Sequence, residues 1–174
     1  VLLPDGHREP ARAQMTIRHL LCHMAGLTYG FQGDAAAREY AAAGVLADEA
    51  LSLQDQCRLI ASLPLALHPG SGWRYSVASD VLAAVLEVET GRPIAEVLRQ
   101  RVFDPLGMAD TGFFVPEAAR DRIMAMHGSP LPEGLPSILP LSVDTLHPPD
   151  NAHYGRGGHG LFSTLAAYSR FAET

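Results

Sequence analysis

Residues 69–91, PGSGWRYSVASDVLAAVLEVETG, join a tight turn to the most regular helical pattern in the chain. The Pro-Gly-Ser-Gly start favours a turn, and Ser76 is a residue type that often caps the N-terminus of a helix. Gly91 favours termination of that helix. The apolar residues between them cover much of a helix circumference: Val77, Val81, Leu82, Val85, Leu86 and Val88. The stretch therefore predicts a largely buried helix that begins beside a tyrosine, Tyr75.

The other helical patterns are shorter, and each carries a boundary signal. Thr16 and Ser52 precede apolar residues at helical spacing, and Asp55 completes a capping box with Ser52. Gly26 favours the end of the first helix, and Gly44 weakens the second. The predicted helices span residues 16–26, 34–47, 53–62 and 93–103, and a last helix starts at Ser163 or Thr164.

Two segments lack a regular pattern. Residues 117–126 fit either a helix or a strand. Six prolines lie between Pro130 and Pro149, which favours a long irregular excursion over regular hydrogen bonding. We therefore expect a mainly α fold with short irregular or β segments, organised as one domain over residues 1–174.

Composition narrows the range of partners and compartments. The formal net charge is -6, and only 18% of the residues are charged, so no basic stripe for nucleic acid or a membrane surface is present. No signal segment and no apolar run of about 18 residues is found. Cys22 and Cys57 fall in apolar helical patterns, and we expect both to be reduced core residues. The compartment stays undetermined, with the cytoplasm slightly favoured over the periplasm.

Three local patterns suggest chemistry but have simpler explanations. Gly155, Gly157 and Gly160 match G-x-G-x-x-G, yet no hydrophobic strand precedes them, so a turn with positive φ or close backbone packing is expected instead of a nucleotide site. His19, Cys22 and His23 share one helical face and could bind zinc, although core packing is the commoner role. Ser71 lacks the first glycine of a nucleophile elbow. We expect neither a metal nor a cofactor.

Tyr75 has two interpretations on its own sequence context. Aromatic residues beside turns usually serve packing. A phenol at a helix N-terminus can also act as a base, because the helix dipole and the free N–H groups favour the phenolate.

Three longer stretches change this balance: TIRHLLCHMAGLTYGF, the run from LPLALHPGSGWRYS to DTGFFV, and GGHGLFSTLAAYSRF. In this order they resemble landmarks of the serine β-lactamase-like hydrolases, which include class C β-lactamases, D-alanyl-D-alanine peptidases and carboxylesterases. The resemblance implies that the chain is the helical domain of a fold that also has an α/β domain, with the active site in the cleft between the two domains.

The resemblance also implies roles for particular residues. Tyr75 matches the tyrosine of the family's Y-x-N motif, which would carry the proton between the serine nucleophile and the leaving group. Val77 stands where the lactamases have asparagine, so the pattern is closer to the family's esterases. The residues expected to border the substrate site are Tyr29, Phe31, Val77, Asp80 and His159.

The chain contains thirteen basic residues, and all of them are arginine. Without lysine, neither the S-x-x-K nucleophile motif nor K-T-G can occur in it. We therefore expect a section of a larger acyl-enzyme hydrolase of small esters or amides, inactive by itself, whose docking face for the α/β domain promotes self-association. A noncatalytic binding module on the same helical scaffold is the alternative.

Overall fold

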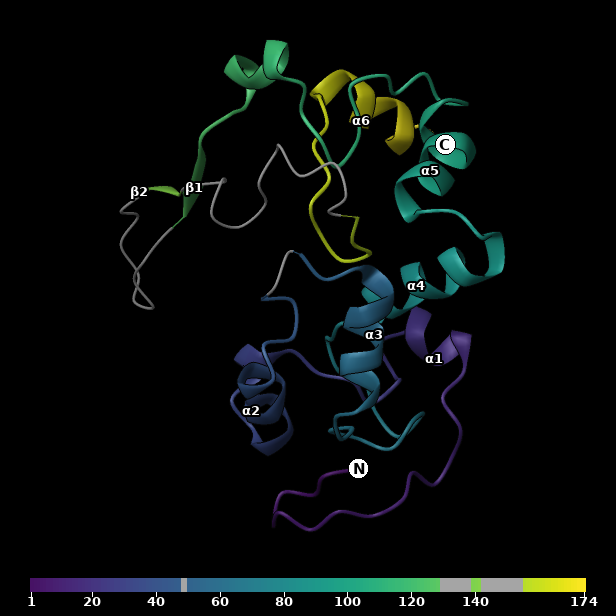
Figure 1. Ribbon diagram of the computed structural model, residues 1–174, viewed down its shortest axis with the longest axis vertical. Coiled ribbons are helices and arrows are strands. Elements are labelled where there is room, and N and C mark those ends of the chain that lie inside the picture. The colour runs from purple at the N-terminus through teal and green to yellow at the C-terminus, as the bar shows by residue number, and fades with distance from the viewer. Residues whose placement is uncertain (48–49, 129–138, 142–154) are drawn as a thin grey trace.

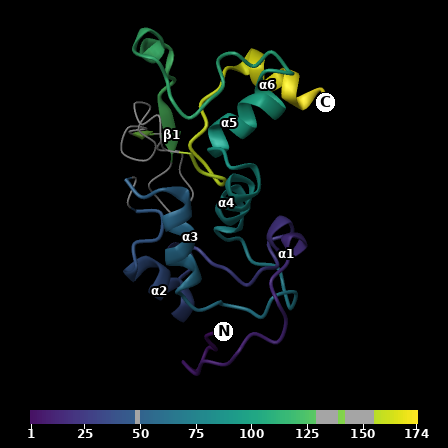
Figure 2. The same ribbon diagram turned by 45° about the vertical axis from the view of Figure 1, so that its right-hand side comes forward.

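The protein was analysed as a computed structural model that describes residues 1–47, 50–128, 139–141 and 155–174. The described part is elongated, with the N-terminus at one end of the long axis and the C-terminus near the other (Figures 1 and 2). Helix α4 (Ala78–Thr90) occupies the middle and packs against three other helices, α1 (Ile17–Leu21), α3 (Leu53–Ala61) and α5 (Ile94–Leu98). The fold is mainly helical, as the sequence predicts.

Helix α4 has the predicted position but a different cap and a different degree of burial. Val77, with φ -66° and ψ 17°, is the N-cap residue in place of Ser76, and it provides no side-chain cap. Gly91 ends the helix in the left-handed region, at φ 64°. The prediction of a largely buried helix is wrong for the second half, where Leu86 is 44% and Val88 68% exposed.

Side-chain caps fix the starts of three other helices. The Ser52 hydroxyl accepts the Asp55 N–H at 3.1 Å, so Ser52 caps α3 as predicted. The Asp55 carboxylate accepts from the Ser52 hydroxyl at 2.6 Å and not from the Ser52 N–H, so the reciprocal bond of the expected capping box differs. Thr16 caps α1, and Asp34 caps α2 (Ala35–Ala42). Both helices are shorter than predicted, because His23 (φ 53°) and Gly44 (φ 69°) are in the left-handed region that ends helical geometry.

The second half of the chain begins with a composite helix. Helix α5 continues directly into a π-helical segment, η2 (Arg99–Phe103), and together they span the predicted 93–103 helix. Residues 117–122 form a 3₁₀ helix, η3 (Glu117–Arg122), within the segment predicted as helix or strand. Thr164 caps the last helix, α6 (Leu165–Ala172), by accepting the Ala167 N–H at 3.2 Å.

Strand structure is limited among the described residues. Strands β1 (Met126–Gly128) and β2 (Leu139–Leu141) pair antiparallel, with Met126 opposite Leu141. Most of the proline-rich stretch predicted to be irregular, residues 130–149, lies outside the described residues. A short 3₁₀ turn, η1 (Gly30–Gln32), packs against α2.

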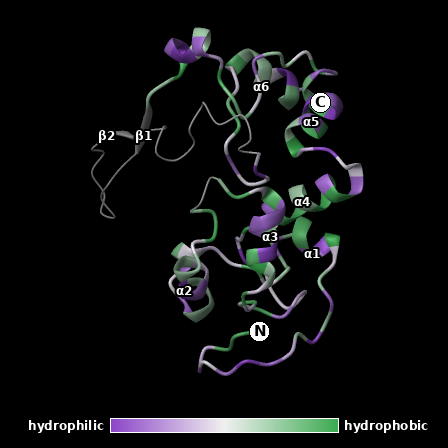
Figure 3. Ribbon diagram, in the orientation of Figure 1, coloured by the Kyte–Doolittle hydropathy of each residue, from purple (hydrophilic) through white to green (hydrophobic). Residues whose placement is uncertain are grey.

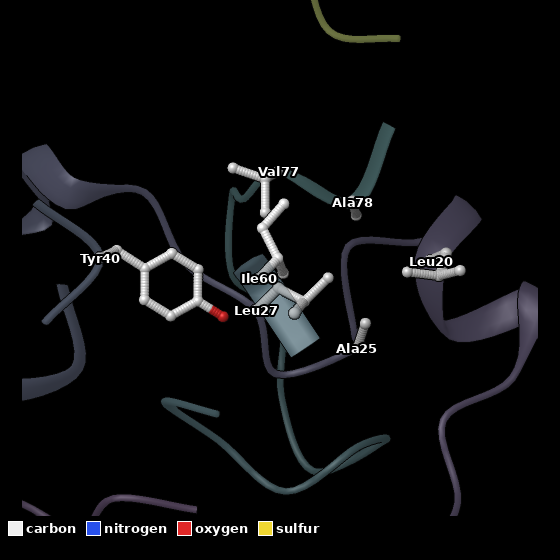
Figure 4. Close-up of a cluster of buried hydrophobic side chains, with 7 residues drawn as sticks. All are labelled: Leu20, Ala25, Leu27, Tyr40, Ile60, Val77 and Ala78. Carbon is white, nitrogen blue, oxygen red and sulfur yellow. The ribbon is translucent and has the colours of Figure 1, made fainter. Parts of the chain in front are cut away.

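The core consists of consecutive apolar clusters along the long axis. The first joins α1, α2, α3 and the start of α4 through Leu20, Ala25, Leu27, Tyr40, Ile60, Val77 and Ala78, with the Tyr40 ring directed inward from α2 (Figure 4). The second lies between α3, α4 and α5, and the third joins η2 to α6 through Phe103, Met108 and Ala167. The first and second clusters share α4, and the second and third share the end of α5. One core therefore runs through the described part.

Two surface features complete the fold. The N-terminal arm is mostly hydrophilic (Figure 3). The Leu2 N–H of this arm donates to the Leu65 carbonyl at 2.8 Å. Cys22 is exposed and Cys57 half-buried, both as free thiols, so the expectation of a core position is wrong for Cys22 because α1 ends before it. None of the helices in the described part has the length and hydropathy needed to cross a membrane.

The Ser52 cap of α3 predicts a specific change in the free energy of unfolding. Replacing Ser52 by alanine leaves the Asp55 N–H without its acceptor, and we expect the free energy of unfolding to fall by about 1 kcal/mol. Urea denaturation measures the change. Ser169→Ala is the matched control, because Ser169 lies within α6 and only donates to the Leu165 carbonyl, where alanine is a better helix former. Equal losses at both positions would contradict the capping role.

Candidate functional site

An extended segment before α4 exposes two large aromatic side chains on one side. Trp73 is 68% exposed and Tyr75 46% exposed, whereas the Arg74 side chain between them is only 17% exposed. Side chains of an extended backbone point alternately to opposite sides, which explains the pattern. Trp73 and Tyr75 therefore face solvent together beside the start of α4.

Five rings are linked by successive contacts, and we call them the aromatic strip: Trp73, His23, Tyr75, Tyr29 and Phe31. Successive ring centroids in this order are 6.2, 5.2, 5.0 and 5.0 Å apart. Tyr29 and Phe31 are stacked with an interplanar angle of 16°, and the other pairs are tilted or edge-on. The Tyr75 phenol lies at the centre of the strip.

Polar contacts behind the strip hold its backbone in place. The Arg74 guanidinium donates to the Thr28 hydroxyl at 2.8 and 3.0 Å and forms an ion pair with Asp34. The Arg74 N–H donates to the His23 carbonyl at 2.8 Å. Gln32 Nε2 donates to the Tyr75 carbonyl at 2.6 Å. These contacts fix the segment on both sides of Tyr75.

His23 belongs to the aromatic strip. Helix α1 ends at Leu21, and the left-handed conformation of His23 turns its ring away from the helical register. Its Nδ1 lies 3.5 Å from the Ser76 hydroxyl. No group of three or more His, Cys, Asp or Glu side chains is placed to hold a metal ion within the residues described.

Asp80 is a fully buried carboxylate one turn into α4. Its Oδ1 accepts the N–H groups of Gly157 and Gly158, at 3.0 and 3.3 Å. Its Oδ2 is buried without a hydrogen-bond partner among the described residues. A Cβ on Gly158 would lie 3.0 Å from this oxygen and 3.3 Å from the Tyr29 hydroxyl, so Asp80 lies directly behind Tyr29.

Burial and the nearby Asp80 charge together hold the pKa of the Tyr29 phenol well above its ordinary value. A hydrogen bond and the charge interaction with Tyr75 act in the same direction. The Tyr29 phenol therefore keeps its proton, and its ability to donate a hydrogen bond, to higher pH than an ordinary tyrosine.

The glycine-rich turn packs as a backbone element. A Cβ on Gly157 would lie 1.9 Å from the Ser79 carbonyl oxygen, and Gly160 has φ 93°. These observations confirm the expectation of close backbone packing and positive φ for the G-x-G-x-x-G match. Arg156, only 2% exposed, donates to the Leu51 carbonyl and adds a contact between this turn and the segment before α3.

The other predicted site residues occupy different environments. Phe31 ends the strip and is 75% exposed, while His159 lies in the glycine turn with intermediate exposure. Val77 is completely buried in the first core cluster, so its side chain has no accessible surface. Sequence reasoning missed Trp73, His23 and Gln32 as neighbours of Tyr75. The i, i+2 spacing of Trp73 and Tyr75 in a helix-free stretch could have indicated the first of these.

A hollow lined by described residues lies elsewhere. It has a volume of about 810 Å³ and is bounded by α5, residues 109–116, η3 and the start of α6. Apolar side chains such as Phe114, Val115 and Phe162 line it. None of its lining residues belongs to the aromatic strip, so it is separate from Tyr75.

Comparison with known proteins identifies the family. The family described as Beta-lactamase matches residues 3–174, and the chain belongs to it. Esterase EstB of Burkholderia gladioli is 35% identical over 91% of this chain and 44% of its own length. Lovastatin esterase of Penicillium rubens is 30% identical over 90% of this chain and 38% of its own length.

Solved structures give the same relationship. EstCE1, described as a hydrolase with promiscuous acyltransferase activity, superimposes with a TM-score of 0.75 and 32% identity over 99% of this chain and 47% of its own. The chain thus spans less than half the length of these relatives. It is a mainly helical section of the fold of the serine β-lactamase-like hydrolases.

The tight packing of Gly157 gives a testable prediction. A methyl group at this position would collide with the Ser79 carbonyl, so Gly157→Ala should displace the turn from Asp80 and lower the free energy of unfolding by about 2 kcal/mol. Hydrogen exchange of amides 155–162 should accelerate. Gly72→Ala is the control, since its Cβ would meet only Leu67 Cδ1 at 3.6 Å. Unchanged exchange in Gly157→Ala would show that the turn is not held against α4.

The raised pKa of Tyr29 predicts a loss of stability at alkaline pH. In the unfolded chain a tyrosine loses its proton near pH 10, whereas folding holds the Tyr29 proton to higher pH. The stabilising contribution is therefore complete below about pH 10 and is lost as the pH rises further. Tyr29→Phe should show a smaller difference between urea midpoints at about pH 8 and 11. Tyr168→Phe, at a residue 60% exposed on α6, is the control and should match the wild type.

Proposed function

We propose that this chain is the helical section of a serine hydrolase that works through an acyl-enzyme, and that Tyr75 is its proton-transfer residue. In this scheme a serine elsewhere in the polypeptide attacks the ester carbonyl and transfers its proton toward Tyr75. The proton is then delivered to the leaving alcohol. A water molecule then attacks the acyl-enzyme through the same steps and releases the carboxylic acid.

The position of Tyr75 is the observation that carries the proposal. Its phenol is accessible, its backbone is fixed by Gln32 and by the contacts of Arg74, and it precedes the N-terminus of α4. The positive end of the helix dipole favours the phenolate form of Tyr75, which is the form that can take up the serine proton. A tyrosine that served packing alone would not require an exposed hydroxyl on a face lined with further rings.

An ester is the substrate class that the observations favour. The similar proteins named above are described as esterases and as a hydrolase with acyltransferase activity. Val77 occupies the position of the lactamase asparagine and is buried, so position 77 supplies no amide side chain to the site. Small amides are a second substrate class for the same chemistry.

Neighbouring residues take supporting roles in this proposal. Tyr29 and Phe31 contact the substrate through the strip, and His159 borders it from the glycine turn. Asp80 acts as a positioning residue, because it holds the glycine turn and lies behind Tyr29.

The rest of the enzyme is proposed to supply the nucleophile and to cover an apolar face. The chain itself has no lysine, so an S-x-x-K motif has to come from outside these residues. Around α6 several large apolar side chains are exposed, with Leu165 and Met124 at 84% and Tyr168 at 60%. Such a patch favours packing against further polypeptide or, in the isolated chain, self-association.

A pair of proteins tests the proposed role of Tyr75. The isolated chain should give no turnover of 4-nitrophenyl butanoate and no labelling by a fluorophosphonate probe, since it has no activated serine. A longer polypeptide that adds the flanking coding sequence should be active, and Tyr75→Phe should lower its kcat about 10²-fold to 10⁴-fold.

The matched control is Tyr168→Phe in the longer polypeptide, which removes a distant phenol from α6 and should leave kcat unchanged. Labelling of a serine in the isolated chain would contradict the division of the active site. Full activity of Tyr75→Phe in the longer polypeptide would contradict the proton-transfer role.

A further inference from the structure

The two ends of the aromatic strip carry more exposed ring surface than proton transfer requires. Phe31 is 75% and Trp73 68% exposed, and they are the first and last rings in the succession of ring contacts that passes through Tyr75. Large apolar side chains gathered on one face usually mark a binding surface. The arrangement of these rings therefore indicates which ligands the site accepts.

We propose that the aromatic strip binds an extended, uncharged apolar or aromatic ester and disfavours substrates that carry a carboxylate. The inference rests on the proposed function for the identity of the reacting group, but the binding step does not depend on catalysis.

The length of the strip supports an extended ligand. From Tyr75 the ring contacts pass through His23 to Trp73 and, separately, through Tyr29 to Phe31. An acetyl ester at the Tyr75 phenol would leave both end rings uncovered. A ligand with apolar groups on both the acyl and the alcohol sides of the ester can stack along the strip and remove these rings from water.

The charges around the strip support an uncharged ligand. Arg74 is the cation closest in sequence, but its guanidinium points to the opposite side and is bound to Thr28 and Asp34. Two carboxylates lie behind the strip: that of Asp34 is paired with Arg74, and that of Asp80 acts on Tyr29 through its charge. A carboxylate on the ligand would find this negative charge and no available guanidinium from Arg74. Such a substrate is therefore disfavoured.

Trp73 is the only tryptophan of the chain, so its fluorescence reports binding to the strip directly. The experiment titrates the isolated chain with two matched anilides at about pH 8, above the usual titration range of histidine. N-(4-nitrophenyl)butanamide is uncharged, and N-(4-nitrophenyl)succinamate adds one terminal carboxylate. The nitrophenyl group quenches tryptophan emission on contact. We expect saturable quenching by the butanamide and about ten-fold weaker binding of the succinamate.

Variants assign the signal to the strip. Phe31→Ala removes one end ring without touching Trp73 and should weaken butanamide binding about five-fold, the value of one aromatic contact. Phe171→Ala is the matched control, because Phe171 is 46% exposed on α6 and pairs with Tyr168 instead. Its affinity for the butanamide should equal that of the wild type. Circular dichroism confirms that each variant is folded.

Each outcome is decisive for the inference. Non-saturating quenching by the butanamide, equal affinity for the two anilides, or equal effects of the two phenylalanine variants would overturn it. Binding without any effect of Tyr75 on turnover in the longer polypeptide would refute the proposed catalytic role while leaving the binding inference intact.

Discussion

The hydrogen bonds from Gly157 and Gly158 to the buried carboxylate of Asp80 are the constraint on which the candidate site depends. They connect segments 77 and 78 residues apart in the sequence. A carboxylate at this depth is costly unless N–H groups surround it, and the two glycines supply them because no Cβ keeps their backbone away from α4. The same contact places the turn behind Tyr29. The position of the glycine turn, the start of α4 and the tyrosine pair are thus coupled.

A second constraint comes from the extended segment that leads into α4. Its alternation sends Arg74 inward and Trp73 and Tyr75 outward, and the inward residue is then held by Thr28 and Asp34. Since Asp34 also caps α2, one carboxylate links the start of a helix to the geometry of the strip. The apolar face therefore rests on a polar layer, which keeps the exposed rings from collapsing into the core.

The sequence predicted the elements whose boundaries are set by local chemistry. The caps at Thr16, Ser52 and Thr164 and the stop at Gly91 are decided within four residues of chain, so they can be recognised without knowledge of the fold. The role of Asp80 could not be predicted, because its partners lie far away in the sequence. The left-handed His23 could not be predicted either, and it decides both the early end of α1 and the exposure of Cys22. Val77 shows the opposite case. Its place in the sequence motif suggested a site residue, but packing at the start of α4 buries its side chain in the core.

The contacts that orient Tyr75 all come from within this chain. Gln32 holds its carbonyl, the Arg74 N–H binds the His23 carbonyl, and the rings of His23 and Tyr29 flank its side chain. A group that is positioned before its reaction partner arrives does not need to be reorganised during the reaction, which is the condition for efficient proton transfer. Under the proposed function the site would be divided, with this section supplying a prearranged surface and proton carrier and another section the nucleophile. Binding and bond cleavage would then be separable properties, because the first requires only the strip and its polar support.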